Sequence, residues 1–423
     1  TTSQRGGMVF LDRNGGELYG GPIQDVRAFF EGMEIDDQRG EGLYSVTGRL
    51  PSFLFAPARL KWFQVHQPKI FEKIDAVLPI NDWLTFRMSG QVRCARSALG
   101  EIGLLNIATG EKDPLIMKGL DIDLSVVPDL GHAGQLVGEV TVAASGDTGL
   151  REGTPVVLGG PDTQCGLLGM GVVEAEQLGV LAGWSGPLQL VTSQAIFDCE
   201  GRTWTGRHVV AHRWVLESST TEAGRSLEWF ATVLGTDYNE IDIGGTPELE
   251  KSDYLGQDQA VAYLGPRIMN AKKLGLQLGG FMFPVPAGQM GISRQDLLRG
   301  ALENLAFAIK GNALQLAEVS GLEPSMVCLG GGVTNIRAFP QLAADTLDTA
   351  IQVPEMKDPS PLGAAMCAAT GVGVYGSLAE AAVEMKAPDR SIEPEKSNAS
   401  LMEERYRRWL SLYRGLEGLS GEL

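Results

Sequence analysis

The chain has 423 residues, of which 43% are hydrophobic and 21% charged; these are globular proportions, and the length predicts two or three domains. A net charge of −17 disfavours DNA, RNA and anionic membranes as partners, and no stretch reaches the ~18 apolar residues of a membrane span. Five scattered cysteines without a CxxC pair argue against a disulfide framework and favour a cytoplasmic location.

The N-terminal part of the chain is predicted to begin with a hairpin and to continue into helices. Residues 6–21 contain two apolar strands around an Asn-Gly turn. Residues 52–74 carry apolar side chains at helical spacing. A short strand and a helix follow within residues 75–90, and the helix is expected to open at Asn81 or Asp82 because both side chains are good N-caps.

Two further apolar strands are predicted in the middle of the chain, and each leads into glycines. Residues 152–160 form a short buried strand that is followed by Pro161 and Asp162. Residues 177–192 form a second hairpin, whose turn is Gly183–Gly186.

The strongest predicted helix lies in the C-terminal part of the chain. Ser293 and Asp296 form an S-x-x-D capping box, apolar residues recur every three or four positions, and Gly321 ends the helix. The elements expected after it are a strand at 325–332, a helix at 337–348, a strand at 350–354 and helices at 360–376 and 399–416. The alternation of strand and helix predicts an α/β fold with largely parallel sheets.

Asp162 is a candidate catalytic residue. A carboxylate at the carboxyl end of a buried strand could take a proton from an attacking alcohol, and the glycines before it would clear space for a substrate. Alternatively, Asp162 only caps the next helix, which is the commoner role of an Asp in that place. The residues alone leave both interpretations open.

Two Gly-rich turns have the composition of phosphate sites. In "AGWSG", the N–H groups and the Ser185 hydroxyl could cradle a phosphate. In "CLGGGVTN", residues 328–335, three glycines let the backbone approach a ligand, and a polar cap leads into a helix whose N–H groups favour anions. The alternative for each stretch is an ordinary tight turn.

Two other motifs are weak. "GVGVYG" contains the glycines of a GxGxxG sequence, but it follows a helix and has no acidic partner about 20 residues on, so a helix end and a loop are expected rather than a dinucleotide site. His208 and His212 have possible metal-ligand spacing. Because no Glu follows His208, as H-E-x-x-H chemistry requires, they are interpreted as ordinary histidines of a strand.

Together, these stretches resemble the FGGY carbohydrate kinases, from near residue 1 to near residue 385, and look most like the autoinducer-2 kinase and xylulokinase side. The family's Gly-Gly-x-Asp turn is similar to residues 159–162, its second phosphate turn to residues 183–186, and its Asp-Trp-Leu helix to residues 80–90. The residues that resemble its adenosine motif and following helix are Gly330, Gly331, Gly332, Asn335, Gln341, Ala344, Asp345, Gly363, Ala364 and Ala365. The segments similar to its sugar site supply Gln4, Arg5, Asp25 and Arg27.

The resemblance implies two ribonuclease-H-like domains of the actin and sugar-kinase superfamily around a cleft, with residues 1–171 binding sugar and 172–423 binding nucleotide. It implies ATP and Mg²⁺ as cofactors, a small sugar or polyol as substrate, Asp162 as general base, and a possible homodimer; no metal ligand is predicted in the protein. The implied substrate-binding residues are Gln4, Arg5, Asp25, Asp162 and Trp184. The implied nucleotide-binding residues are Gly183, Ser185, Gly186, Gly330, Gly331, Gly332 and Asn335.

The chain also departs from the family pattern. No Asp-x-Gly-Thr turn precedes Thr1, so the first domain is expected to be incomplete at its N-terminus. Trp184 replaces a small hydroxyl residue, and Cys94 and Ala95 take the place of a Thr-Asp pair. The alternative function is therefore a non-catalytic sugar- or nucleotide-binding relative with a degraded phosphate site. A third interpretation, a dehydrogenase, would rest only on "GVGVYG".

Overall fold

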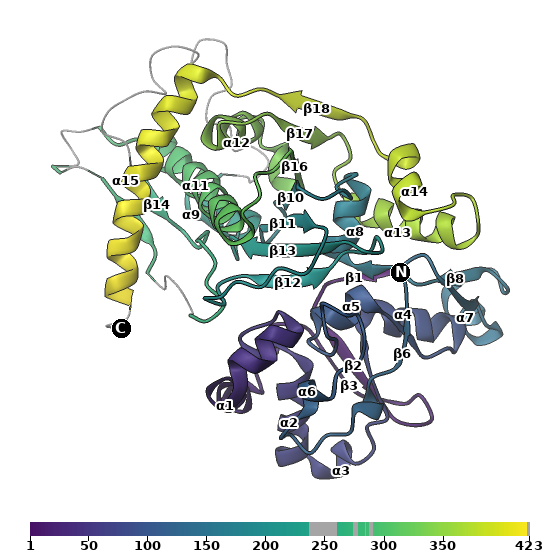
Figure 1. Ribbon diagram of the computed structural model, residues 1–423. Coiled ribbons are helices and arrows are strands. Elements are labelled where there is room, and N and C mark those ends of the chain that lie inside the picture. The colour runs from purple at the N-terminus through teal and green to yellow at the C-terminus, as the bar shows by residue number, and fades with distance from the viewer. Residues whose placement is uncertain (237–259, 274–277, 284, 287–290, 421–423) are drawn as a thin grey trace. The chain divides into compact units, whose positions relative to one another are not determined.

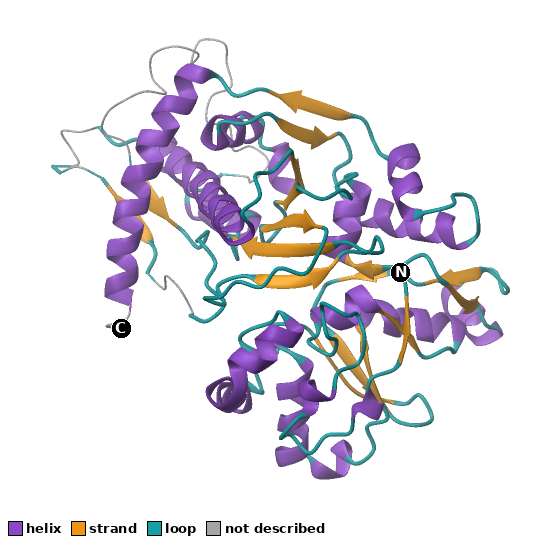
Figure 2. Ribbon diagram, viewed as in Figure 1, coloured by secondary structure: helices purple, strands orange, loops and turns teal. Residues whose placement is uncertain are grey.

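The computed structural model describes residues 1–236, 260–273, 278–283, 285–286 and 291–420 (Figure 1). The chain forms two compact units. The first comprises Thr1–Ala175, Val191–Leu216 and Asp358–Ala387, and the second Glu176–Leu190, Glu217–Lys357 and Pro388–Leu423. Both contain helices and strands, as Figure 2 shows, so the predicted α/β class is confirmed; the boundary between residues 171 and 172 stays a prediction. No helix in the described ranges is long and apolar enough to cross a membrane.

The predicted N-terminal hairpin is confirmed and forms two of the three strands of a sheet in the first unit. β2 (Met8–Leu11) pairs antiparallel with β3 (Glu17–Gly21) and with β4 (Ala76–Pro79). All four residues of β2 are buried, as a strand covered on both faces requires. The hairpin turn is held by Asp12, whose Oδ1 accepts a hydrogen bond from the Gly16 N–H at 2.9 Å.

The helices of the N-terminal part are short except for the first. They are α1 (Phe29–Thr47), α2 (Ala56–His66), α3 (Pro68–Phe71), α4 (Ile80–Ser89), α5 (Arg96–Glu101), α6 (Pro114–Met117) and α7 (Val142–Thr148). Two 3₁₀ turns, η1 (Ser52–Leu54) and η2 (Leu124–Val126), lie between them. The helical pattern predicted within residues 52–74 is thus confirmed as α2 and α3.

The predicted N-caps of α4 are wrong, because the helix follows directly from β4 with Pro79 at its N-cap position. Asn81 and Asp82 lie inside the first turn and are buried. The Asp82 carboxylate accepts hydrogen bonds from Asn81 Nδ2 at 2.9 Å and from the Ala95 N–H at 3.1 Å. Burial raises the pKa of Asp82 to about 8, so the side chain serves the core instead of a helix end.

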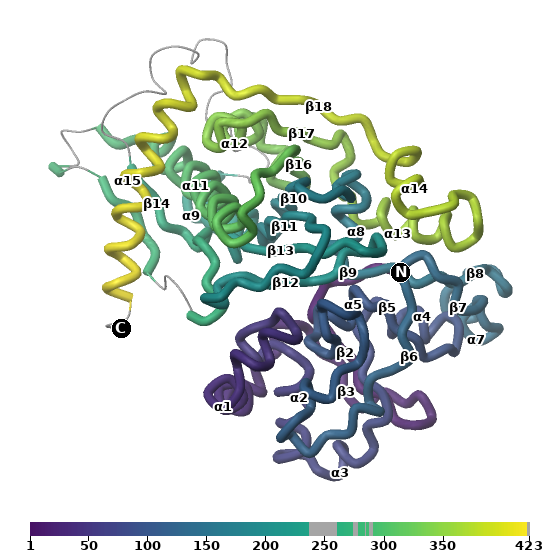
Figure 3. Tube along the Cα trace, in the orientation of Figure 1, coloured from purple at the N-terminus to yellow at the C-terminus, as the bar shows by residue number. Residues whose placement is uncertain are grey.

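Short strand pairs complete the first unit. β1 (Thr2–Ser3) pairs parallel with β9 (Gly160–Pro161), and the two lie side by side in Figure 3. β5 (Arg93–Ala95) pairs parallel with β6 (Asp129–Gly131), and β7 (Leu136–Glu139) pairs antiparallel with β8 (Pro155–Val157). The strand predicted within residues 152–160 is confirmed as β8.

Helices α8 (Asp162–Gly169) and α13 (Pro359–Gly371) pack at very close range through two glycines, and α14 (Leu378–Met385) lies next to them. A Cβ atom at Gly363 would lie 1.9 Å from the Cys165 carbonyl oxygen, and one at Gly169 would lie 2.1 Å from the Pro359 oxygen. The helix predicted over 360–376 is confirmed to Gly371, and "GVGVYG" is a helix end and loop, as expected.

The largest sheet has the strand order β12-β13-β11-β10-β16-β17-β18. Its strands are β10 (Gln177–Leu181), β11 (Pro187–Thr192), β12 (Trp204–Arg207), β13 (Trp214–Ser219), β16 (Met326–Gly330), β17 (Ile351–Pro354) and β18 (Asp389–Ile392). β16 pairs parallel with β10 and β17, whereas β10–β11 and β17–β18 are antiparallel. The expectation of largely parallel sheets is therefore wrong, because a hairpin and a returning C-terminal strand join the parallel centre.

The strand predicted around His208 and His212 is also wrong. β12 ends at Arg207, and His212 has a φ of +58°, which belongs to a turn and not to a strand. His208 is buried and its Nδ1 accepts a hydrogen bond from the Val210 N–H at 3.0 Å. Burial lowers the pKa of His208 to about 4, so it is a neutral structural residue.

The long helix of the second unit is confirmed with its capping box. α11 (Arg294–Ser320) begins after Ser293, whose Oγ accepts from the Asp296 N–H while Asp296 accepts from the Ser293 N–H. The other elements of this unit are α9 (Gly224–Val233), β14 (Val261–Tyr263), β15 (Gly280–Met282), η5 (Gly332–Asn335), α12 (Phe339–Leu347) and α15 (Lys396–Ser420). The helices predicted at 337–348 and 399–416 are thus confirmed.

We predict that Gly363→Ala destabilises the protein by about 2 kcal/mol or more, because the new methyl group meets backbone atoms of α8 that cannot rotate away. The matched control is Gly146→Ala in α7, where no atom lies within 4 Å of an added Cβ. That control should leave the unfolding free energy unchanged or raise it by up to about 1 kcal/mol. Urea unfolding of both variants measures the difference, and equal stability would contradict the close helix contact.

Candidate functional site

The pairing of β1 with β9 brings Asp162 next to Arg5. Because parallel strands leave a pair at the same end, the residues after Ser3 and after Pro161 emerge together. Asp162 Oδ1 accepts hydrogen bonds from the Arg5 backbone N–H at 3.2 Å and from the Thr163 N–H at 2.9 Å. Two predicted site residues that are 157 positions apart in the chain are thereby in contact.

The glycines before Asp162 allow this chain packing and do not clear space for a ligand. A Cβ atom at Gly159 would lie 1.9 Å from the Thr1 carbonyl oxygen, and one at Gly160 would lie 2.6 Å from Val209 Cγ1. The expectation that these glycines open room for a substrate is therefore wrong. Their lack of side chains is needed so that β1 and β9 can approach each other.

The environment of Asp162 favours a carboxyl group that accepts protons readily. Burial raises the pKa of Asp162, while the Arg5 charge and the N–H donors of Thr163 and Arg5 lower it, and the net effect is an increase. The N-cap position of α8 is Pro161, and Asp162 is the first helical residue. The carboxylate thus contacts the start of the helix through the Thr163 N–H and also accepts from the Arg5 N–H.

A buried ion-pair cluster that the sequence analysis did not identify adjoins Asp162. Glu101, at the end of α5, is 2% exposed and pairs with Arg49 through Oε1 and with Arg5 through Oε2, at 3.7 Å. Gln164 Nε2 donates to Glu101 Oε1 at 2.8 Å. The guanidinium groups of Arg5 and Arg49 lie 5.4 and 5.1 Å from the centroid of the Trp204 ring. The only sequence signal for this cluster is a single acid within the apolar run "ALGEIGLL".

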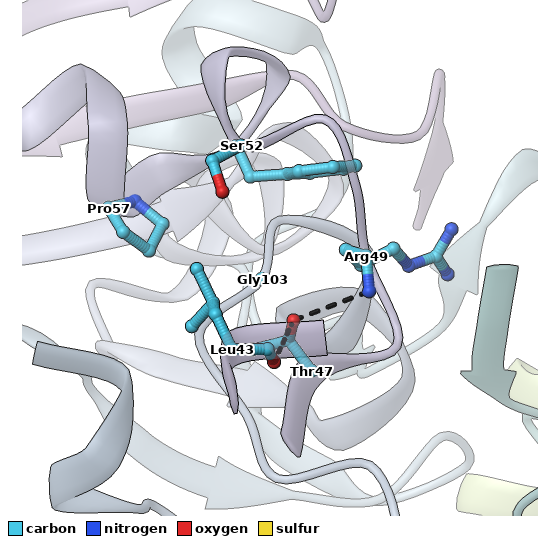
Figure 4. Close-up of a pocket in the computed structure, with 7 residues that line it drawn as sticks. Leu43, Thr47, Arg49, Ser52, Pro57 and Gly103 are labelled. Carbon is cyan, nitrogen blue, oxygen red and sulfur yellow. Dashed lines mark hydrogen bonds between the residues drawn. The ribbon is translucent and has the colours of Figure 1, made fainter. Parts of the chain in front are cut away.

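The first unit also contains a small pocket, to which Arg49 of this cluster contributes. Its lining residues are Leu43, Thr47, Arg49, Ser52, Phe55, Pro57 and Gly103. The Arg49 backbone N–H donates to Thr47 Oγ1 at 3.3 Å, while the Arg49 guanidinium points away from the pocket (Figure 4). The pocket is mainly apolar and includes none of the predicted site residues, so it is not the candidate site.

Asp25 belongs to a different cluster. Its carboxylate accepts hydrogen bonds from the Tyr19 hydroxyl at 2.7 Å and from Arg27 Nε at 2.8 Å. Burial raises the pKa of Asp25, but the bonds from Arg27 and Tyr19 outweigh it and lower the pKa overall. Within the described part of the chain, the hydrogen bonds of Asp25 do not reach Asp162. Gln4, by contrast, is exposed and directly precedes Arg5.

The two Gly-rich turns of the second unit lie against each other. The Ala182 N–H donates to the Gly330 carbonyl at 2.8 Å, and the Val333 N–H donates back to the Ala182 carbonyl at 3.0 Å. The Gly224 N–H, at the start of α9, donates to the Gly183 carbonyl at 2.8 Å. The turns predicted to bind nucleotide therefore form one continuous backbone surface.

The glycines of these turns divide into two kinds. A Cβ atom at Gly331 would lie 2.6 Å from the Ala182 backbone, and one at Gly186 would lie 2.3 Å from Thr220 Oγ1. No atom lies within 4 Å of an added Cβ at Gly183 or at Gly332. These two positions leave open space into which a ligand could bring its atoms close to the backbone.

Trp184 is 71% exposed at the tip of the turn between β10 and β11, so it does not fill a protein core. The Arg225 guanidinium lies 5.7 Å from the centroid of its ring. Ser185, the next residue, accepts a hydrogen bond at its carbonyl from the Gly183 N–H at 3.0 Å. An exposed aromatic face next to open backbone can stack on a flat or sugar-like ligand.

The polar residues after Gly332 have mainly structural contacts. Asn335 is exposed at the end of η5, and α12 begins later with Ala338 at its N-cap position, so the expected polar cap into a helix is wrong. Gln341 Nε2 donates to Asp345 Oδ1 at 2.9 Å. Asp345 also accepts from the Glu395 N–H at 2.8 Å, which ties α12 to the C-terminal segment.

Comparison with protein families matches two parts of the chain. Residues 1–169 match the model for the N-terminal domain of the FGGY family of carbohydrate kinases, and residues 275–372 match the model for its C-terminal domain. Autoinducer-2 kinases of Enterobacter sp. (strain 638) and Yersinia pestis bv. Antiqua (strain Angola) are each 28% identical, over 99% of this chain and 80% of their own length.

Solved structures share the fold. A xyloylose kinase from Brucella ovis superposes with a TM-score of 0.86 at 22% identity, over 99% of this chain and 84% of its own. A xylulose kinase from Lactobacillus acidophilus gives 0.86 at 16% identity, over 100% and 84%. The predicted two-domain sugar-kinase fold is therefore confirmed.

We predict that Gly331→Ala lowers the free energy of unfolding by about 2 kcal/mol. Its φ of +102° is strained for any side chain, and the new methyl group meets the Ala182 backbone. Gly332→Ala, at the adjacent open position, should unfold at the same denaturant concentration as the wild type. Equal loss in both variants would mean that the two turns do not pack as described.

Proposed function

Because the chain belongs to the FGGY family of carbohydrate kinases, which are phosphotransferases, we propose that it transfers the γ-phosphoryl group of ATP to a hydroxyl of a small sugar or polyol. The observation that carries this proposal is Asp162, a carboxylate of raised pKa that the backbone N–H groups of Arg5 and Thr163 hold in place. The names of two relatives, an autoinducer-2 kinase and a xyloylose kinase, support a small sugar or sugar-like molecule as the substrate.

Asp162 is proposed as the general base. Its carboxylate takes the proton from the attacking hydroxyl as the oxygen bonds to the γ-phosphorus, and the bond from phosphorus to the bridging oxygen breaks to release ADP. A carboxyl group whose pKa lies above its usual range is a stronger base, yet it remains ionised when the pH exceeds that pKa. The proposed base therefore loses activity as the pH falls through its pKa.

Substrate binding is proposed for Gln4, Arg5, Asp25, Asp162 and Trp184. Gln4 is exposed and Arg5 is in contact with Asp162, so both can reach a ligand at that point. Trp184 offers an exposed ring. Asp25 is proposed on the family resemblance, although its carboxylate already accepts bonds from Tyr19 and Arg27.

ATP is proposed to bind at Gly183, Ser185, Gly186, Gly330, Gly331, Gly332 and Asn335. The residues fit such a group, because the open positions at Gly183 and Gly332 let phosphate or adenosine approach the backbone. No group of three or more His, Cys, Asp or Glu in the described ranges could hold a metal by itself. Mg²⁺ typically keeps several waters and binds substrate phosphates, so an ion bound with the nucleotide would neutralise phosphate charge, and no metal ligand is proposed in the protein.

A second candidate function is a non-catalytic sugar- or nucleotide-binding protein. The observation in its favour is Trp184, whose large exposed ring stands where the resemblance implies a small hydroxyl side chain. The two functions differ in turnover: a kinase releases ADP only when sugar is present, whereas a binding protein shows ligand affinity without ADP release.

Further proposals concern the organisation and location of the protein. We retain residues 1–171 as the sugar-binding domain and residues 172–423 as the nucleotide-binding domain. All five cysteines are free, which suits a reducing compartment such as the cytoplasm. A homodimer without nucleic-acid or membrane partners is proposed on the family resemblance and the net charge of −17.

We predict that Asp162→Asn lowers kcat about 10²- to 10⁴-fold, because the amide cannot accept the hydroxyl proton. The variant keeps the size of the side chain and an oxygen for the Thr163 and Arg5 N–H groups, so sugar binding and thermal stability should change little. Sugar-dependent ADP release, measured over a panel of ketoses and polyols, provides the test. A kcat within twofold of the wild type would reject Asp162 as the base.

We also predict that Gly332→Ala raises the KM for ATP about tenfold and leaves the KM for sugar unchanged. The methyl group enters open space, so it disturbs a bound nucleotide without disturbing the fold. The control is Gly146→Ala, which also adds a methyl group in open space but lies in the other unit. An unchanged KM for ATP would place the nucleotide away from this turn.

A further inference from the structure

Glu101 is a buried carboxylate for which the proposed mechanism has no direct use. A charge taken out of water is costly unless it is paired and hydrogen-bonded, and a cluster of charges in a core adds little to stability compared with apolar packing. Glu101 nevertheless pairs with both Arg49 and Arg5 and accepts a hydrogen bond from Gln164. The cluster therefore calls for an explanation beyond folding.

The contacts of Glu101 reach both sides of Asp162. On one side, Glu101 Oε2 lies 3.7 Å from Arg5 Nη1, and the Arg5 backbone N–H donates to Asp162. On the other, Glu101 Oε1 accepts from Gln164, which lies two residues after Asp162 in the first turn of α8. The Glu101 carboxylate thus contacts each of the two segments that meet at the proposed base.

Arg5 is further restrained by an aromatic ring. The Trp204 ring has the guanidinium of Arg5 at 5.4 Å and that of Arg49 at 5.1 Å from its centroid. Two like charges near one ring repel each other unless an anion lies between them, and Glu101 pairs with both. The ion pair with Glu101 and the contact with the Trp204 ring together restrain the Arg5 side chain.

We propose that Glu101 is a positioning residue for phosphoryl transfer: it holds the Arg5 side chain and the first turn of α8 so that Arg5 stays beside Asp162. Glu101 does not exchange a proton or contact the reacting atoms. This inference rests on the proposed function, and in particular on Asp162 as the general base.

The charge on Glu101 also has a predictable effect on the base. Burial raises the pKa of Asp162, and the positive charge of Arg5 opposes that increase. Glu101 partly neutralises Arg5, so loss of its charge should lower the pKa of Asp162 and weaken the base. Other charged or titratable groups on or near α8 include Cys165 in α8, Cys367 in α13, Glu380 and Glu384 in α14, Arg96 in α5, the Thr1 amino group and Arg49.

The test is Glu101→Gln, which keeps the shape of the side chain and removes its charge. We expect the KM for the sugar to rise and kcat/KM to fall about tenfold to a hundredfold, because Arg5 and the start of α8 are no longer held in place. In a plot of kcat against pH, the fall of kcat on the acidic side should shift to lower pH by about half a pH unit. The matched control is Glu17→Gln, which removes the same charge from an exposed pair with Arg87 at 2.7 Å and should leave both quantities unchanged.

The conservative variant Glu101→Asp distinguishes the effect of the negative charge from the effect of side-chain length. It keeps the carboxylate but withdraws it by one methylene, so the fall of kcat on the acidic side should return to its wild-type position while the KM for sugar stays raised. If Glu101→Gln is recovered unfolded, Glu101→Asp decides instead: a raised KM at wild-type melting temperature supports the proposal, and an unchanged KM overturns it.

The outcomes separate this inference from the proposed function. If Asp162→Asn is inactive but Glu101→Gln has wild-type kcat, KM and pH profile, the positioning role is wrong and the kinase remains. If the wild type releases no ADP with any sugar, or Asp162→Asn retains full activity, the proposed function itself fails.

Discussion

The close approach of β1 to β9 is the constraint on which the first unit depends. Only a residue without a side chain can stand at Gly159, because a Cβ there would lie 1.9 Å from the Thr1 carbonyl oxygen. The parallel pairing that follows brings Arg5 to Asp162, and with it the buried charges of Arg49 and Glu101. Backbone packing thus decides where the charged side chains meet, and those side chains in turn decide the chemistry that the site can support.

Three aspartates of this chain differ in pKa and in role because their surroundings differ. Asp82 is fully buried, and its pKa rises to about 8, so it serves as a hydrogen-bonded part of the core. The pKa of Asp25 is lowered by Arg27 and Tyr19, which keeps the carboxylate ionised and paired. Asp162 lies between these extremes, partly buried and partly balanced by Arg5. This intermediate environment is an argument for the proposed role of Asp162 as the general base.

In the second unit, the candidate nucleotide-binding site consists mainly of backbone groups. Gly183 and Gly332 leave open space, whereas Gly186 and Gly331 are needed for packing, so each of the two turns combines one open glycine with one packed glycine. Trp184 is the feature at which the kinase and the binding-protein interpretations diverge. Its ring is exposed, so it is available to a ligand. Sugar-dependent ADP release would indicate that the ring permits phosphoryl transfer, whereas ligand binding without ADP release would indicate that it obstructs the transfer.

The sequence by itself determined the elements whose signals are local: the hairpin around the Asn-Gly turn, the capping box at Ser293 and the end of α13 at Gly371. The order of its Gly-rich motifs also determined the family. Only the tertiary structure decided that Asp82 is buried and that Glu101 joins Arg5 beside Asp162. The physical reason is distance along the chain, because burial and charge pairing depend on residues from remote segments, whereas turns and caps depend on immediate neighbours.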